Sequence, residues 1–136
     1  MSSLLDRDEH ARALGVELVD ETPGTAVVRM RVRGDMVNVH GTCHGGLVFS
    51  LADIAFELAC NGVHGDDVTT VAAAADIEFL APAAAGAVLT ATCTERIRQG
   101  RTGVYDADVV DESGTTIAVF RGRSRTTGPV SGGARA

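Results

Sequence analysis

The longest apolar run in the chain spans residues 47–60 and is interrupted by only three polar side chains. These are Ser50, Asp53 and Glu57, whose positions i, i+3 and i+7 place them on one narrow stripe of an α-helix. A helix with almost no polar face has to be covered on most sides. The pattern therefore predicts a long, buried central helix with a single polar stripe.

Shorter segments alternate between apolar and polar residues, as half-buried β-strands do. Val28 and Met30, for example, flank Arg29, so the apolar groups share one face and the guanidinium lies on an outer, solvated face. A Pro-Gly turn at residues 23–24 predicts a hairpin near the start of the chain. The expected strands cover residues 16–19, 26–32, 68–75 running into 76–80, 87–98, 104–110 and 115–126.

One long helix and about six strands joined mostly by hairpins indicate an α+β arrangement, in which an antiparallel sheet curls around the helix. Residues 4–14 predict a short peripheral helix that ends at Gly15. The Gly-rich residues 128–136 predict a flexible tail. We expect a single domain over residues 1–136, because one core of this size can bury most of its apolar surface.

Charge and cysteine usage narrow the class of protein. The formal net charge of −6 opposes binding to nucleic acid or to an anionic membrane, and no apolar run is long enough to span a bilayer. The first residues carry Asp6, Asp8 and Glu9 in place of the basic and apolar regions of a signal peptide. The three cysteines show no CxxC spacing, which favours reduced thiols. We therefore expect a cytoplasmic protein with no nucleic-acid or membrane partner.

Several short motifs follow one another along the chain: NVHGTCHGG at 38–46, FSLAD at 49–53, ACN at 59–61, DIEFLAP at 76–82, GVYD at 103–106 and FRGRS at 120–124. In this order they resemble the PaaI-type hotdog thioesterases of phenylacetate degradation. The resemblance implies the hotdog fold, a curved antiparallel sheet wrapped around a long central helix. It also implies hydrolysis of phenylacetyl-CoA or hydroxyphenylacetyl-CoA, with coenzyme A as part of the substrate and no separate cofactor. The implied assembly is a homotetramer of two dimers.

Asp53 is the first candidate for catalysis. A carboxylate in an apolar helix costs several kcal/mol of desolvation unless it is paired, solvated or used, although it could also bind the amides of a neighbouring loop. The resemblance implies that Asp53 is the catalytic carboxylate, acting as a general base on water or as a nucleophile that forms a mixed anhydride. Glu57 could tune its proton affinity or reach solvent or an arginine, and we leave it outside the catalytic set.

The start of the central helix supplies candidate oxyanion donors. Gly45 and Gly46 precede the apolar run, where backbone N–H groups lack partners within the helix, although two glycines also permit a tight turn. The resemblance makes the Gly45 N–H the oxyanion donor and places Gly46 against the substrate. It also implies that Asn38 and His44 orient the thioester or water, while each could instead hold the loop before the helix.

Gly45 and Asp53 are eight positions apart, which is about 12 Å along a helix axis. One thioester carbonyl cannot easily touch both groups in one chain. If both act on one substrate, the site lies across a two-fold interface, and a homodimer is the minimal active unit.

Two features of the strands bear on substrate binding. Residues 71–75 read Val-Ala-Ala-Ala-Ala where relatives often carry a Ser or Thr near the carboxylate, so Thr69 or Thr70 is a possible substitute. Arg121 and Arg123 share a strand face with Arg125 and are candidates for the coenzyme A phosphates, with Arg96, Arg98 and Arg101 as weaker ones. The alternative is a solvated face paired with acids, since a hairpin centred on Ser113-Gly114 places Asp106 opposite Arg121.

Other functions remain open on the sequence alone. The fold is also compatible with a non-hydrolytic acyl-CoA binding module, or with an enoyl-CoA hydratase, whose paired His/Asp loop we do not find. His40, Cys43 and His44 lack the further spaced ligands of a metal site, so we expect none. Cys43 as a nucleophile has no obvious base beside it. Candidates for core or pocket walls, with core preferred, are Phe49, Phe56 and Phe79.

Overall fold

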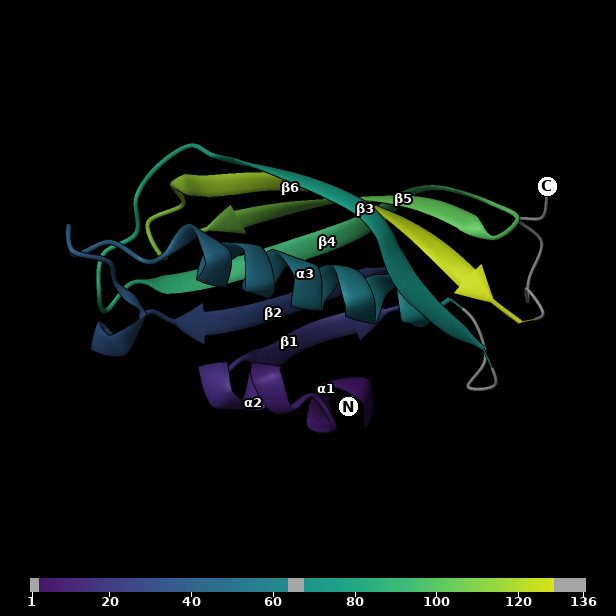
Figure 1. Cartoon of the computed structure of the whole chain (residues 1–136), viewed down its shortest axis with the longest axis horizontal. Coiled ribbons are helices and arrows are strands. Elements are labelled where there is room, and N and C mark those ends of the chain that lie inside the picture. Colours follow the sequence, from purple (N-terminus) through teal and green to yellow (C-terminus); the bar gives the residue numbers. More distant parts are fainter. Residues whose placement is uncertain (1–2, 64–67, 129–136) are drawn as a thin grey trace.

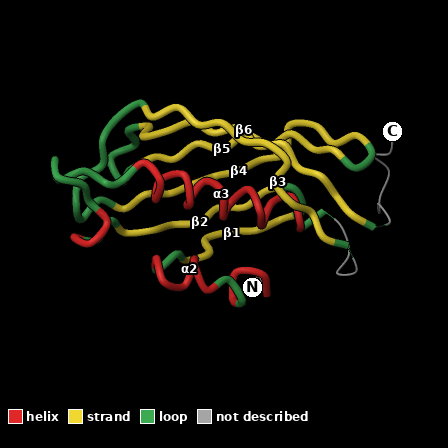
Figure 2. The backbone as a smooth tube through the Cα atoms, in the orientation of Figure 1, coloured by secondary structure: helices red, strands yellow, loops and turns green. Residues whose placement is uncertain are grey.

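The computed structural model describes residues 3–63 and 68–128, which form one antiparallel sheet and one long helix. The sheet has the strand order β1-β2-β4-β5-β6-β3, and every neighbouring pair is antiparallel. The helix α3 (Gly45–Asn61) lies along one face of the curved sheet (Figures 1 and 2). The strands are β1 (Glu17–Thr22), β2 (Thr25–Arg31), β3 (Thr69–Phe79), β4 (Val88–Gln99), β5 (Thr102–Val110) and β6 (Thr116–Thr127).

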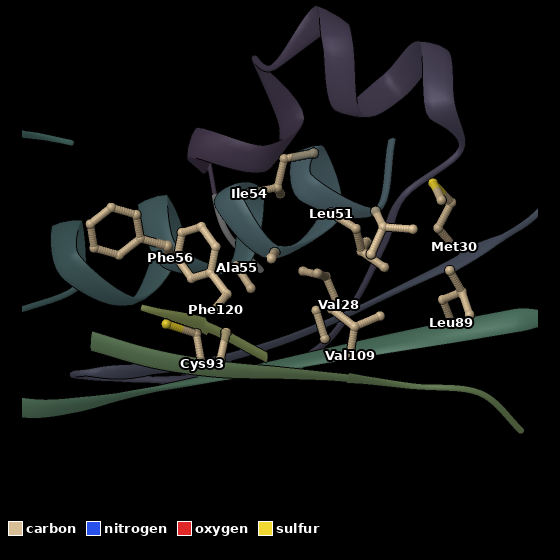
Figure 3. Packing of buried hydrophobic residues seen from close by; sticks show 14 of the residues in the cluster. Val28, Met30, Leu51, Ile54, Ala55, Phe56, Leu89, Cys93, Val109 and Phe120 are labelled. Atoms are coloured by element: carbon tan, nitrogen blue, oxygen red, sulfur yellow. The ribbon is translucent and has the colours of Figure 1, made fainter. Parts of the chain in front are cut away.

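The core lies between α3 and the inner face of the sheet. Figure 3 shows Leu51 and Ala55 of α3 above Val28 and Val109 of the strands, and all four are fully buried. Aromatic rings fill the other end of this layer. Phe56 packs against Phe120 and Tyr105, with ring centroids 5.7 Å and 5.5 Å apart.

Gly122 of β6 fixes how closely α3 approaches the sheet. A Cβ at this position would lie 2.8 Å from two ring atoms of Phe56, so only glycine fits. The helix therefore sits directly on the strand.

The central elements agree with the sequence pattern. The long buried helix and the α+β arrangement are confirmed, and each of the six predicted strands is present. The last hairpin pairs Asp106 with Arg121, whose Nε lies 2.6 Å from the carboxylate, as expected. The sheet is less meander-like than predicted, because β2 pairs with β4, and β3 leaves its neighbours in sequence to pair with β6.

The prediction of one peripheral helix over residues 4–14 is wrong in two respects. The segment forms two short helices, α1 (Ser3–Asp6) and α2 (Glu9–Leu14), because Asp8 caps α2 by accepting a hydrogen bond from the Ala11 N–H at 3.0 Å. The segment is also packed onto the body of the protein, where Ala11 is 1% exposed. The stop at Gly15 is confirmed, with φ 73°.

Strand β3 forms one edge of the sheet and is exposed along most of its length. Thr70 is its only buried residue, while Val71 and Phe79 are about half exposed, at 48% and 53%. The predicted tail at residues 128–136 lies outside the described residues except for Gly128. In the described part of the chain, no helix is long and apolar enough to cross a membrane.

Candidate active site

A cavity of about 650 Å³ lies beside the polar stripe of α3. Asp53 and Glu57 line it from the helix, and residues 68–72 line it from the start of β3. The N-terminal segment closes a further side with Leu4 and Arg7. The helix periodicity thus places two carboxyl groups, one turn apart, in the same partly enclosed space.

Both carboxyl groups hold their protons more tightly than usual. Burial raises the pKa of Asp53, the negative charge of Asp8 raises it further, and His10 opposes these effects. The pKa of Glu57 is raised by burial, then by the charges of Asp8 and Asp53 and by a side-chain hydrogen bond with Asp8. Carboxyl groups whose pKa is raised by burial and by neighbouring negative charge are candidates for a catalytic role.

Asn61 holds the β3 wall of the cavity against the end of α3. Its amide nitrogen donates to the carbonyl oxygens of Glu57 and Thr70 at 2.9 Å and 3.0 Å, and its oxygen accepts from the Thr70 N–H at 2.9 Å. The Thr70 hydroxyl forms a buried hydrogen bond with the Thr126 hydroxyl at 2.9 Å, so it does not point into the cavity. Thr69, which lines the cavity and is exposed, is the better placed of the two threonines to meet a water or substrate.

The start of α3 borders a second, smaller cavity of about 280 Å³. Among the described residues, no acceptor is bonded to the N–H groups of Gly45 and Gly46, as expected for the first turn of a helix. The ring of Phe79 lies against Gly45, where a Cβ would be 3.0 Å from Phe79 Cζ. The preference for Phe79 as a core residue is therefore wrong, and it forms an exposed wall beside the candidate oxyanion donor.

Asn38 and His44 take different parts in the loop before α3. The side-chain oxygen of Asn38 accepts from the N–H groups of His40 and Thr42 and from the Thr42 hydroxyl. This directs the amide nitrogen away from the loop, and it has no partner among the described residues. His44 is the N-cap of α3 through its backbone, and its exposed imidazole makes no capping bond.

Gly45 and Asp53 do not meet within one chain. Gly45 borders the smaller cavity and Asp53 the larger one, and the two cavities share no lining residue. This separation agrees with the spacing argument from the helix rise.

The arginines of β6 lie on the face of the sheet opposite α3. Arg121 forms a bidentate pair with Asp106, at 2.6 Å and 3.0 Å. Arg123 is exposed, has no ion pair within the described ranges, and borders a hollow of about 160 Å³ next to Ala74 and Ala75 of β3. Arg125 is exposed on the same face.

The alternative of Cys43 as a nucleophile loses support in the structure. Cys43 is buried, and burial raises the pKa of its thiol, which disfavours the thiolate a nucleophile needs. Within residues 3–63 and 68–128, no group of three His, Cys, Asp or Glu side chains could hold a metal ion.

The sequence pattern did not identify the N-terminal part of this site. Arg7 lines the large cavity, and the ring Nε2 of His10 lies 3.0 Å from the Ser50 hydroxyl on the polar stripe. The negative charge of Asp8 raises the pKa of both Asp53 and Glu57. These contacts join residues some 40 positions apart, so no local signal could have revealed them.

Comparison with known proteins gives a consistent picture. The model of the thioesterase superfamily matches residues 40–118. The acyl-coenzyme A thioesterase PaaI of Escherichia coli K12 is 44% identical over 126 residues, covering 93% of this chain and 88% of that protein. A putative esterase of Deinococcus radiodurans is 38% identical, covering 83% of this chain and 75% of its own length.

Solved structures show the same likeness. The structure of E. coli PaaI aligns with a TM-score of 0.87 at 42% identity, covering 98% of this chain and 92% of that one. A mutant of the phenylacetic acid degradation protein PaaI from Thermus thermophilus aligns with a TM-score of 0.81 at 37% identity, covering 87% and 98%. With the six-stranded sheet around α3, these matches confirm the predicted hotdog fold. The chain therefore belongs to the thioesterase superfamily, as a PaaI-type hotdog enzyme that hydrolyses thioester bonds.

Proposed function

We propose that the protein hydrolyses acyl-CoA thioesters of the phenylacetyl-CoA or hydroxyphenylacetyl-CoA type, releasing the free acid and coenzyme A, with Asp53 as its catalytic carboxylate. The observation that carries the proposal is the position of Asp53, which is half buried on an apolar helix and lines a cavity of about 650 Å³ beside α3. The E. coli relative named as an acyl-coenzyme A thioesterase supports the substrate class.

The chemistry needs a base or nucleophile and donors for the developing oxyanion. Asp53 in its ionised form accepts a proton from water, or attacks the thioester carbon and expels the coenzyme A thiolate to give a mixed anhydride. The Gly45 N–H donates to the carbonyl oxygen as negative charge develops there, and Gly46 lets the substrate approach the backbone. The amide nitrogen of Asn38 and the ring of His44 are donors that can orient the thioester or the water.

We assign the complete site to a homodimer, within the tetramer that the family likeness implies. Asp53 comes from one subunit and the Gly45 N–H from its two-fold partner, since a single chain keeps the two groups in separate cavities. The free edge of β3 supports this assembly, because an exposed strand edge with apolar side chains such as Val71 and Phe79 favours pairing with a second copy.

We place the coenzyme A phosphates near Arg123, on the outer face of the sheet. The hollow beside Arg123 and the cavity of Asp53 both border β3, one on each face. Arg121 adds positive charge to the same hollow, although it is already paired with Asp106.

The deciding measurement is thiol release from phenylacetyl-CoA, hydroxyphenylacetyl-CoA and aliphatic acyl-CoAs. We expect selective hydrolysis of the aryl substrates by the wild type and a loss of at least about a hundredfold in kcat for Asp53→Asn. Asp108→Asn, a change of the same type at an exposed site on the outer face of β5, is the matched control and should leave the rate unchanged. Equal rates for wild type and Asp53→Asn would remove Asp53 from the mechanism.

Further arms of the same assay separate the remaining alternatives. A wild type that binds acyl-CoA without hydrolysing any thioester would overturn the proposal in favour of a binding module. Single-turnover hydrolysis in isotopically labelled water distinguishes the two roles of Asp53, because a nucleophilic route in which water attacks the aspartyl carbonyl leaves the label in the protein. Activity that survives a chelator is expected for a site without metal.

A further inference from the structure

An exposed aromatic ring lies beside the start of α3. Phe79 follows Ile77 on the face of β3 that is turned toward the helix, but it is 53% exposed, whereas Ile77 packs against the core. The helix begins here with Gly45 and Gly46, which have no side chains to cover the ring. A Cβ at Gly45 would lie 3.0 Å and 3.3 Å from Phe79 Cζ and Cε1, so the ring lies directly against the first turn of the helix.

Backbone hydrogen bonds fix the position of this ring. The N–H groups of Leu80 and Ala81 both donate to the carbonyl oxygen of Ile117 in β6, at 2.8 Å and 3.3 Å. Phe79 itself is paired with Ala118 in the ladder between β3 and β6. A wall that is already ordered binds a ligand without the entropic cost of ordering it, so Phe79 offers a preformed contact surface.

The ring forms one wall of the cavity of about 280 Å³. The remaining side-chain walls are also apolar and come from Val48, Leu80, Ile117, Cys43 and residues 81–83. A cavity of about 150 Å³ is enough to hold benzene, so a phenyl group fits this one. The larger cavity carries Asp53, Glu57 and Arg7 on its walls, where covering charged groups with an aryl ring would cost desolvation energy. The smaller cavity is therefore the better match for an aryl group.

The smaller cavity also lies where the acyl end of the substrate has to be. Gly45, whose N–H is the proposed oxyanion donor, is among its lining residues. In phenylacetyl-CoA the ring begins two carbon–carbon bonds from the thioester carbonyl carbon. A carbonyl held by Gly45 therefore brings this ring to Phe79, and aromatic pairs gain more than their buried area alone provides.

We infer that the smaller cavity is the aryl-binding pocket and that Phe79 is its specificity-determining residue, which packs against the ring of a phenylacetyl group and favours it over an aliphatic acyl group. The inference rests on the proposed function, because it takes the Gly45 N–H as the donor to the thioester. A second copy at the edge of β3 is compatible with it. Strand pairing uses backbone groups in the plane of the sheet, whereas the Phe79 side chain stands out of that plane.

The test is kcat/KM for phenylacetyl-CoA relative to hexanoyl-CoA. Phe79→Leu keeps an apolar side chain and removes the ring, so this ratio should fall by about three- to tenfold, while hexanoyl-CoA is hydrolysed as by the wild type. Ile97→Ala is the control. Ile97 is similarly exposed, at 49%, but lines neither cavity, so its loss should leave the ratio unchanged.

Ala81→Leu tests the cavity itself. Ala81 is partly buried and lines the cavity, so a larger side chain takes up the room that a phenyl ring needs. We expect kcat/KM for phenylacetyl-CoA to fall by at least about tenfold, whereas acetyl-CoA, which has no group to place there, should react at the wild-type rate. Leu4→Ala enlarges the other cavity and should leave the phenylacetyl-to-hexanoyl ratio unchanged. If circular dichroism shows that Ala81→Leu does not fold, Phe79→Leu decides alone.

A ratio that is the same in Phe79→Leu as in the wild type, or that changes in Leu4→Ala instead, would overturn the inference and leave the hydrolytic function intact. So would a Phe79→Leu protein that sediments as a smaller species, since Phe79 would then be an interface residue. If the wild type hydrolyses no thioester, the proposed function fails, and calorimetry with S-(2-phenylethyl)-coenzyme A and S-hexyl-coenzyme A decides the inference. Phe79→Leu should weaken binding of the phenylethyl thioether alone, and equal weakening of both, or no binding, would overturn it.

Discussion

The ionised form of Asp53, which the proposed chemistry needs, lowers the stability of the fold. Burial raises its pKa in the folded protein above the value of an unfolded chain, so the folded state is penalised once the carboxyl ionises. The penalty is absent below the unfolded pKa, about 4, grows as the pH rises toward the folded pKa, and is complete above it.

We therefore expect Asp53→Asn to raise the free energy of unfolding at pH 7 by about 1 kcal/mol, a modest gain because solvent screens a half-buried group. Near pH 3.5, below the pKa of an unfolded aspartate, the gain should vanish. Urea titrations of both proteins at the two pH values test this. A variant that is less stable than the wild type at pH 7 would show that Asp53 has a structural partner.

Gly122 offers a prediction about packing. Gly122→Ala would place a Cβ 2.8 Å from the ring of Phe56, and we expect a loss of about 1–3 kcal/mol in the free energy of unfolding. Gly34→Ala, where no atom lies within 4 Å of the new Cβ, should change it little. Adding Phe56→Leu to Gly122→Ala should recover part of the loss if the clash is its cause. Thermal unfolding of the four proteins gives the comparison.

Single residues differ in how far the sequence reveals them. Asp53 and Glu57 could be found because the period of the helix puts them on one stripe, and the structure places both in one cavity. Arg7 could not, because it reaches that cavity only through the packing of the N-terminal segment against α3. Likewise, nothing in the sequence around Phe79 distinguishes an exposed wall from a core ring.

At the scale of elements, the side chain of Asn61 joins α3 to β3. Asn61→Ala would leave the N–H and carbonyl of Thr70 without these partners, and we expect a loss of about 2 kcal/mol in the free energy of unfolding. Asn61→Asp keeps an acceptor for the Thr70 N–H, but its carboxylate would repel the carbonyl oxygens of Glu57 and Thr70. This variant should therefore recover little of the lost stability. Denaturant titration measures both. A loss below about 0.5 kcal/mol for Asn61→Ala would mean that water replaces the amide.

The residue limits of helices and strands could be predicted from the apolar pattern where an element buries only one of its faces. The alternation in β2 and the apolar run of α3 both reflect a face turned to the core, so their limits were predicted to within a few residues. The N-terminal segment was wrongly predicted as one helix because the spacing of its apolar residues is compatible with a continuous helix. The helix is interrupted at Asp8, whose side chain accepts a hydrogen bond from the Ala11 backbone N–H and so starts a second helix.

At the scale of the whole molecule, the free edge of β3 predicts self-association. Ala73 stands at the bulge of β3 and has no partner residue on β6. Proline at this position should therefore leave the pairing of β3 with β6 intact, but it should prevent a strand of a second subunit from pairing with the free edge of β3. We expect Ala73→Pro to sediment as a monomer with a wild-type circular dichroism spectrum and to lose thioesterase activity.

Ala85→Pro is the matched control for this change. Ala85 is the second residue of the turn closed by the Ala87 N–H and the Ala84 carbonyl, and Gly86 follows with φ 93°, a turn that accepts proline at this position. It should keep the assembly and the activity of the wild type. A monomeric Ala73→Pro protein with full activity would contradict the two-subunit site.

The order of the strands is the part of the architecture that patterning could not supply. Alternation tells which side chains face the core but not which strands are neighbours, and the β2–β4 and β3–β6 pairs join distant segments. The element pattern predicted a sheet curled around the helix, and the likeness to hotdog thioesterases implied the same arrangement.

The pairing of β3 with β6 also sets the order in which the protein can mature on the ribosome. β3 leaves the exit tunnel well before β6, and contacts such as that between Thr127 and Thr69 span 58 positions. Until β6 emerges, β3 has no strand to pair with and the β3 wall of the Asp53 cavity is unsupported. Catalytic competence therefore arrives only with the last residues of the sheet, so that a nascent chain stalled before residue 116 holds α3 without a site.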